Sequence, residues 1–395
     1  MVAFLVRRLL QMFVVTILAA MVSYGLIYLL PGGPIDALRA ERQNAGANRI
    51  GEDDLIRIRE RFELDLALPV RFTRWLIGWP TGPVLGNSSA TVGCAVPALV
   101  RYRYPDGTTE IREEGCAQPV TLADLEGRKA SRGVMFGDFG TSLTILRDQP
   151  VSRLIATRLP YTLWLMGVST LLAILIAVPI GVYSAVRQYS PFDYAATTAA
   201  FIGSSLPSFV FGIFAILLFS ILPNLAGWPY LPSGNATFNR PTTIPLLGTI
   251  EPRSIQDYIL HFIMPCAVLT FINIAGFSRF VRGSMLEVLN QDYVRTARAK
   301  GVKERLVIIK HALRNSLIPF VTLLAGLLAT IFGGALITES VFNWPGLGRL
   351  FIDALVSFDY NVVMALLIIN VVLLLIGILI TDILYTVVDP RIRLS

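Results

Sequence analysis

The sequence has few side chains that could hold a metal ion. It contains only two histidines, His261 and His311, and three cysteines, Cys94, Cys116 and Cys266. The two histidines lie in different segments, and no combination of these residues has the spacing of a metal-ligand cluster. The sequence therefore predicts no metal site.

Charged residues are also scarce. They make up 15% of the 395 residues, whereas hydrophobic residues make up 54%. A soluble protein of this size usually carries about 25% charged residues. The shortfall indicates that much of the chain lies in a bilayer, where charge is costly. The net charge of +7 does not indicate nucleic acid as a partner, because the basic residues flank apolar runs, as in membrane proteins.

Six apolar runs are long enough to cross a membrane as helices, which takes about 20 residues. They lie at 9–30, 159–186, 195–222, 258–278, 315–338 and 361–381. Pro179 and Pro207 lie inside two of these runs, and prolines are tolerated there because neighbouring helices can satisfy the freed carbonyls. The sequence thus predicts an all-α polytopic membrane protein with six transmembrane helices.

Basic residues predict the orientation of these helices. The 279–314 loop is rich in arginine and lysine, and the C-terminal tail carries Arg391 and Arg393. The positive-inside rule places this loop, the 188–194 link and both termini in the cytoplasm. The run at 9–30 is longer than a typical signal core, so we expect an uncleaved anchor.

The segment 31–158 is too long to be a simple link, and we expect it to form an extracytoplasmic domain between a first part, 1–30, and a core, 159–395. Helical spacing of apolar residues predicts one short helix after Asp53 and another at 70–79. Strand-like residues at 96–104 and 109–113 around a turn at 105–108 predict a β-hairpin. The hairpin is either a contact surface for a soluble partner or an addition without such a role.

Two cysteines flank this hairpin. Cys94 and Cys116 lie roughly opposite each other outside its two arms. An oxidising compartment would favour a disulfide between them. The alternative is two unpaired thiols.

A short charged segment between two apolar runs is the most informative part of the chain. Its helix-prone residues are Asp292, Tyr293, Arg295, Thr296, Ala297, Arg298, Ala299, Lys300 and Gly301. Ala297 and Ala299 are small enough for another backbone to approach closely, and Gly301 can adopt the left-handed conformation that ends a helix. Two interpretations stay open: a helix bound in a groove of a soluble partner, or a basic loop lying on lipid headgroups.

The 292–301 segment, with 311–315 and 317–319, resembles the cytoplasmic signature of ABC importer permeases. It is most similar to the dipeptide/oligopeptide (peptide/nickel) branch, B-type subunit. Segments 7–10 with 31–34, 137–142, 339–348 and 388–391 agree with that branch. The resemblance covers nearly the whole chain apart from about 84–134, which looks like an insertion. Arg295 and Thr296 stand where the general signature has Glu and Ala, which puts any salt bridge by that Glu in doubt.

The resemblance implies a type I ABC importer permease fold with a cytoplasmic coupling segment, 282–314. It implies a heterodimer with a second similar permease, two ABC ATPase subunits that receive the coupling helix, and an extracytoplasmic solute-binding protein. No Gly-rich phosphate loop followed by Lys-Ser or Lys-Thr occurs in the sequence, so ATP and Mg would be bound by the partners and this chain is not expected to be an enzyme. The implied location is the bacterial inner membrane. The substrate stays open among dipeptides, oligopeptides, nickel, glutathione and other solutes such as sugars.

The 339–348 segment is expected at the outer mouth. Glu339, Asn343 and Trp344 either touch or gate cargo there, or belong to a re-entrant or short helical loop held by Pro345 and Gly346. The rival function is an ion-coupled secondary transporter. Such a protein needs ionisable residues deep in the membrane, and the sequence offers none at mid-span.

Overall fold

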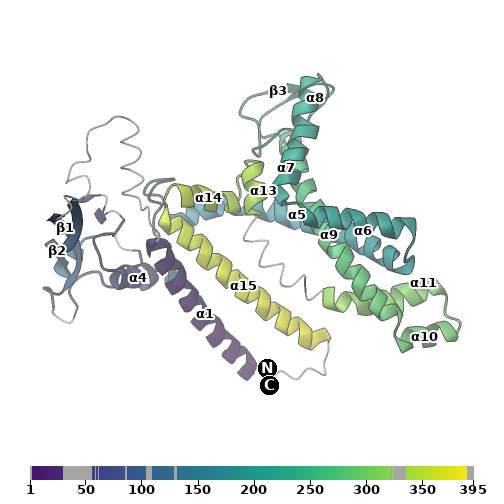
Figure 1. Ribbon diagram of the computed structural model, residues 1–395, viewed down its shortest axis with the longest axis horizontal. Coiled ribbons are helices and arrows are strands. Elements are labelled where there is room, and N and C mark those ends of the chain that lie inside the picture. Colours follow the sequence, from purple (N-terminus) through teal and green to yellow (C-terminus); the bar gives the residue numbers. More distant parts are fainter. Residues whose placement is uncertain are drawn as a thin grey trace. The chain divides into compact units, whose positions relative to one another are not determined.

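The computed structural model describes residues 2–29, 56–57, 59–60, 62–84, 87–103, 109–128, 131–320, 323 and 335–388 (Figure 1). The chain divides into two compact units. Unit 1 comprises Met1–Met12, Thr157–Ile352 and Ile369–Ser395. Unit 2 comprises Phe13–Ala156 and Asp353–Ile368.

Long apolar helices dominate the fold. The longest are α1 (Val2–Leu29), α5 (Val151–Val186), α9 (Ile255–Leu289) and α15 (Tyr360–Val388). With Ser208–Leu225, they make five helices in the described part of the chain that are long and apolar enough to cross a membrane. The predicted helical membrane fold is confirmed, and the run at 315–338 lies mostly outside the described residues.

The run at 195–222 was wrongly expected to form a single helix. Helix α6 (Pro191–Ser205) ends before Pro207, and α7 (Ser208–Ile216) begins after it. Leu206, which precedes the proline, is extended at φ −96° and ψ 140°, because the proline ring disfavours helical backbone at the residue before it. The second helix continues through the π-helix η3 (Leu217–Ile221) into α8 (Leu222–Leu225).

Helices α5 and α9 pack closely in unit 1. Ala173 and Ala177 of α5 are fully buried in one cluster with Val281 and Met285 of α9. A Cβ at Gly181 would lie 2.7 Å from the backbone oxygen of Ser278. Small residues let the two backbones approach, which is how membrane helices commonly associate.

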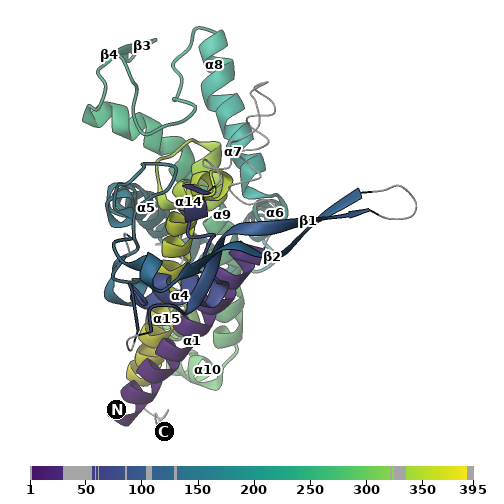
Figure 2. The same ribbon diagram turned by 90° about the vertical axis from the view of Figure 1, so that its left-hand side faces the viewer.

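A short helix and a two-stranded ribbon form the described part of the long segment after α1. Helix α4 (Leu68–Ile77) replaces the helix expected at 70–79, and the helix expected after Asp53 lies mostly outside the described residues. Strands β1 (Thr91–Arg103) and β2 (Thr109–Thr121) pair antiparallel, as Figure 2 shows, and both are longer than expected. The predicted turn at 105–108 lies outside the described residues.

The base of the ribbon carries a hydrophobic cluster of unit 2. This cluster contains the buried side chains of Leu66, Val120, Leu122 and Leu125. Higher along the ribbon, Cys94 and Cys116 form a disulfide with a Cα–Cα distance of 5.8 Å. An isolated two-stranded ribbon is only marginally stable in water, so this cross-link supports the strands beyond the cluster.

The disulfide gives a first prediction. Protein isolated from its native envelope without reductant should yield a Cys94–Cys116 cross-linked peptide by mass spectrometry. Reduction should make the ribbon more sensitive to protease, because a cross-link of this loop size contributes about 3 kcal/mol in the chain-entropy model. Cys266 is a buried free thiol, so we expect it to be alkylated only after denaturation. It serves as the internal control for the alkylation step. Finding Cys94 and Cys116 both alkylated before reduction would refute the pairing.

Candidate coupling site

The charged segment 282–314 folds as short helices at the end of α9. After Leu289 the chain turns into α10 (Asp292–Ala299), followed by α11 (Glu304–Leu306) and the π-helix η4 (Val307–Leu313). Figure 1 shows α10 and α11 beside this end of α9. The short helix expected to end at Gly301 is therefore present.

One face of α10 packs against its own chain. Val294 and Ala297 are buried, and they form a small cluster with Val307, Val288 and Val302. Ala297 was expected on a face open to another backbone, and its burial contradicts that expectation. Its small size serves packing within the segment, because a valine from η4 occupies the adjacent space.

The other face of α10 is open to solvent. Its exposed residues are Asp292, Tyr293, Arg295, Thr296, Arg298, Ala299 and Lys300. Ala299 is the small residue on this face, so it, and not Ala297, marks where a partner could approach closely. The four charged side chains around it make the face polar and predominantly basic.

Two backbone hydrogen bonds end α10 at Gly301. The N–H of Gly301 donates to the carbonyl of Arg298 at 2.9 Å, and the N–H of Val302 donates to the carbonyl of Ala297 at 3.3 Å. Gly301 has a φ of +74°, the left-handed conformation expected from the sequence. This pair of bonds is the Schellman motif, in which the residue after the glycine often makes a hydrophobic contact with the end of the helix. Val302 makes this contact here, since it packs against the Val294–Ala297–Val307 cluster.

An ion pair holds the end of α10 to α11. Arg298 donates through Nη2 to Oε1 of Glu304 at 2.8 Å and through Nε to both carboxylate oxygens at 3.2 Å. Hydrogen bonding by the Arg298 guanidinium lowers the pKa of Glu304 from its usual value. Both side chains are partly exposed, so the pair contributes orientation more than stability.

A buried carboxylate ties α9 to α5 and α6. Asp193, at the start of α6, accepts hydrogen bonds from Nε and Nη2 of Arg282 at 2.7 and 2.9 Å. Ser184 of α5 donates its hydroxyl to the same carboxylate, and the Tyr189 N–H donates at 2.9 Å. The Arg282 guanidinium holds the pKa of Asp193 well below its usual range. We did not expect this anchor from the sequence, where Arg282 counted only toward the basic loop.

The anchor gives a second prediction. Asp193→Asn should lower the midpoint of thermal unfolding, because it removes the charge that pairs with Arg282 and keeps only part of the hydrogen bonding. Leaving a buried charge unpaired costs about 3–5 kcal/mol. The cost here should be smaller, because Arg282 is partly exposed. The native pKa of Asp193 is depressed, so its stabilisation is present above the ordinary aspartate pKa of about 4 and falls only in strong acid. The loss in the variant should therefore be the same from about pH 5 to 8.

Asp292→Asn is the control for this measurement, since Asp292 has a fully exposed side chain. Differential scanning fluorimetry of both variants in detergent checks the result. An unfolding midpoint for Asp193→Asn equal to that of the control would show that the anchor does not stabilise the fold.

Of the residues expected at the outer mouth, Glu339 lies in α13 (Leu336–Val341), and Asn343 and Trp344 lie in the turn between α13 and α14 (Leu347–Val356). Glu339 is fully buried. Its carboxylate accepts from the Thr162 hydroxyl at 3.0 Å and from the Arg349 N–H at 3.0 Å. A Cβ at Gly346 would overlap this carboxylate, so only glycine allows the turn to close over Glu339.

Trp344 and Asn343 complete the turn. Trp344 is buried, and its Nε1 donates to the carbonyl of Tyr161 at 3.1 Å. Asn343 adopts a φ of +51°, which asparagine tolerates better than most residues, and donates its amide to Asn235. The structure thus brings Glu339 and Trp344 together inside the protein and leaves Asn343 partly accessible.

Asp359 is a further residue that the sequence analysis missed. Its buried carboxylate accepts from the Ser142 hydroxyl at 2.5 Å and from the backbone N–H groups of Leu143 and Thr144 at 3.1 Å. It joins the end of the 137–142 motif to the start of α15. In the sequence, Asp359 is marked only by its position directly before an apolar run. Acidic residues at such positions are too common for this position alone to indicate a role.

These features define a class of protein: a polytopic helical membrane protein that displays a short charged helix, fixed at its base, between two apolar segments. Residues 177–394 match the family described as "Binding-protein-dependent transport system inner membrane component", and residues 1–109 match its N-terminal family. The chain belongs to this family of inner-membrane transport components.

Three relatives illustrate the similarity. The oligopeptide transport system permease protein AppB of Bacillus subtilis is 47% identical over 65% of this chain and 76% of its own length. The dipeptide transport system permease protein DppB of Escherichia coli K12 is 39% identical over 66% and 78%. The glutathione transport system permease protein GsiC of Pectobacterium atrosepticum is 38% identical over 66% and 76%.

Family membership confirms several predictions. The chain is a multi-pass component of the inner membrane and works with a substrate-binding protein and an ATPase. It is the permease of such a system and not the enzyme that hydrolyses ATP. The secondary-transporter alternative is not favoured.

Proposed function

We propose that this chain is one of two similar permeases in an ATP-driven peptide importer. The two permeases would form a heterodimer around the translocation pathway, with two ATPase subunits in the cytoplasm that bind ATP and Mg. A binding protein would deliver the peptide from outside. Relatives named for oligopeptide and dipeptide transport support peptides as the cargo class.

The structure of α10 carries the proposal. Its apolar face is already covered by its own segment through Val294 and Ala297, so lipid is not needed to bury it. Its other face is charged and includes the small Ala299, as suits a helix that enters a groove on another protein. Docking of α10 into each ATPase would place the 282–314 segment and both termini in the cytoplasm and the 31–158 segment outside.

The contacts around α10 suggest how its movement would reach the membrane. Closure of the ATPases on ATP would displace α10, which is fixed to α9 through the packed valines and to α11 through Arg298. The Asp193–Arg282 anchor would pass this displacement to α5 and α6. At the far end of the pathway, the turn containing Glu339, Asn343 and Trp344 is our candidate gate.

Reconstitution tests this function. The two permeases and the ATPases are reconstituted together in proteoliposomes. They should hydrolyse ATP faster when peptide-loaded binding protein is present on the extracytoplasmic side of the membrane. Peptide uptake should require ATP and persist when a protonophore removes the proton gradient. Uptake that follows the proton gradient and ignores ATP would overturn the proposal.

A further inference from the structure

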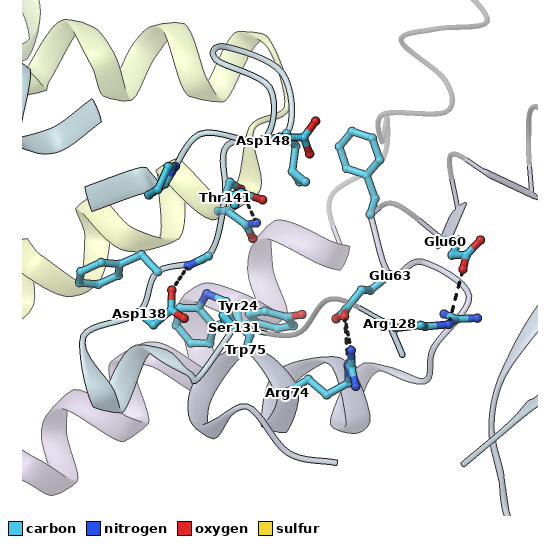
Figure 3. Close-up of a pocket in the computed structure, with 16 residues that line it drawn as sticks. Tyr24, Glu60, Glu63, Arg74, Trp75, Arg128, Ser131, Asp138, Thr141 and Asp148 are labelled. Atoms are coloured by element: carbon cyan, nitrogen blue, oxygen red, sulfur yellow. Dashed lines mark hydrogen bonds and ion pairs between the residues drawn. The ribbon is translucent and has the colours of Figure 1, made fainter. Parts of the chain in front are cut away.

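Unit 2 contains an open cavity of about 560 Å³ that no part of the proposed transport pathway uses. Figure 3 shows its lining, which comes from the end of α1, the 60–63 segment, α4, Arg128, the 131–150 loop and the start of α15. A cavity of this volume is in the range of small-molecule sites. All lining residues belong to the same unit.

The cavity has acidic and aromatic walls. Its lining includes the carboxylates of Glu60, Glu63, Asp138 and Asp148, against the guanidiniums of Arg74 and Arg128. The aromatic rings are those of Tyr24, Phe62, Trp75 and Phe139. Carboxylates outnumber guanidiniums, so a positively charged ligand is favoured, and the rings supply the apolar contact that most binding cavities offer.

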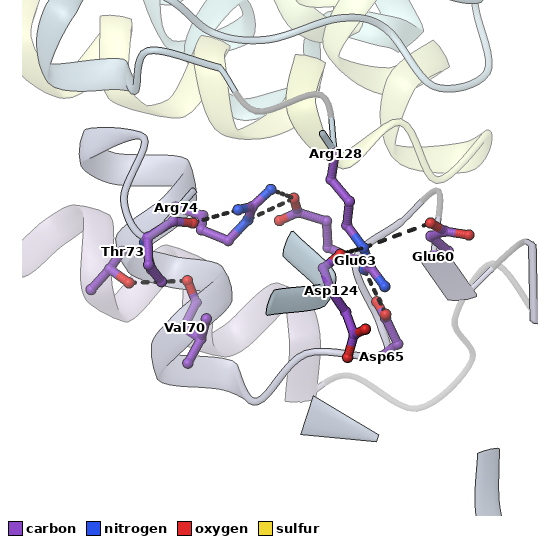
Figure 4. Close-up of polar contacts among 9 residues, drawn as sticks. Glu60, Glu63, Asp65, Val70, Thr73, Arg74, Asp124 and Arg128 are labelled. Carbon is purple, nitrogen blue, oxygen red and sulfur yellow. Dashed lines mark hydrogen bonds and ion pairs between the residues drawn. The ribbon is translucent and has the colours of Figure 1, made fainter. Parts of the chain in front are cut away.

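Ion pairs fix both guanidiniums in place, as Figure 4 shows. Arg74 is buried and donates through Nε to Oε1 of Glu63 at 3.0 Å. Arg128 donates to the buried Asp65 at 2.7 Å and lies 3.6 Å from Glu60. The Glu60 side chain is 53% exposed, so a ligand cation can reach it while Arg128 stays beside it.

Trp75 supplies an independent sign of a ligand. Its side chain stacks on Tyr24 with ring centroids 5.3 Å apart and is 8% exposed. The buried indole Nε1 has no hydrogen-bond partner among the described residues. A buried donor without an acceptor costs about 1–3 kcal/mol, and a carbonyl oxygen of a ligand in the cavity would satisfy it.

We propose that this cavity binds a short, positively charged peptide segment. An ammonium or guanidinium group would lie toward Glu60 and Glu63, a backbone carbonyl would accept from Trp75 Nε1, and the aromatic rings would cover apolar side chains. The peptide class rests on the proposed function, whereas the charge and the donor follow from the cavity itself. The peptide would come either from free cargo or from a basic segment of the binding protein.

Photo-cross-linking without nucleotide tests this site. The probe is a lysine-containing tripeptide with a benzoylphenylalanine residue, added to the complete permease–ATPase complex in nanodiscs. We expect adducts in 56–84 or 131–150 after proteolysis and mass spectrometry. Trp75→Phe keeps the ring and removes the donor, so it should weaken binding about five- to tenfold. Glu60→Gln should weaken it about threefold and reduce its salt dependence.

Glu126→Gln is the matched control, because Glu126 is an exposed acid of the same unit outside the cavity. An N-acetylated, lysine-free tripeptide should label weakly. Labelling by the free tripeptide would identify cargo as the source of the peptide. A second probe carries benzoylphenylalanine in the binding protein. If only this probe labels the site, and the labelling is lost in Trp75→Phe, the source is a segment of the binding protein.

Adducts from neither probe in these two segments, or equal labelling of Trp75→Phe and the unmodified chain, would overturn the site. Because the assay uses no ATP, this failure is separate from a failure of ATP-dependent uptake.

Discussion

Ala299→Trp should strongly reduce transport while leaving the permease folded and inserted. Ala299 is exposed on the open face of α10, so we expect the tryptophan to point into solvent in the isolated permease and to collide with the wall of an ATPase groove. Overpacking of a fitted contact costs about 1–3 kcal/mol, enough to lower uptake about fivefold to a hundredfold. ATP-dependent uptake and stimulated ATPase activity in proteoliposomes check the result.

Two variants at neighbouring positions make this prediction specific. Ala299→Ser preserves the small size and should transport normally. Ala297→Trp should instead lower the amount of folded protein, because Ala297 is buried in the valine cluster. If Ala299→Trp transports as well as Ala299→Ser, α10 does not dock through this face.

Gly301→Val should uncouple transport by changing the end of α10. Gly301 has a φ of +74° and nothing lies within 4 Å of an added Cβ, so the cost is one of backbone conformation and not of a clash. A β-branched residue in this region costs about 1–2 kcal/mol, which should favour loss of the two capping hydrogen bonds and turn α10 away from its fixed direction. We expect uptake to fall at least about fivefold with normal membrane insertion.

Gly301→Asn provides the matched control. Asparagine adopts left-handed backbone more readily than other non-glycine residues, so this variant should retain most of its uptake. Equal uptake by the valine and asparagine variants would mean that the conformation at this position has no part in coupling.

The sequence predicted the long helices well because their signal is strong. A run of some 20 apolar residues without charge has one stable solution in a bilayer, a helix that satisfies its own backbone. The left-handed Gly301 was predictable for a similar reason, since glycine after a short helix is the common way to end it. These features depend on local composition alone.

The errors arose where tertiary contacts decide. Pro179 stays inside α5 whereas Pro207 separates α6 from α7, and no local pattern distinguishes these two prolines. The burial of Ala297 depends on Val307, which follows in another helix. Asp193 and Arg282 are far apart in the sequence, so their pairing could not be inferred from either residue. The candidate site was therefore located by sequence, but its inner and outer faces and its anchor were not.

Coupling in this transporter requires that an ATPase subunit hold α10 in the cytoplasm. Benzoylphenylalanine placed at Ala299, in intact cells that express the whole transporter, tests this most directly. This arrangement predicts an ultraviolet-dependent adduct between this chain and the ATPase, which is absent when the photoreactive residue replaces Ala297. Adducts with phospholipid alone, or labelling of a cysteine at position 299 by a membrane-impermeant reagent added outside the cells, would contradict it.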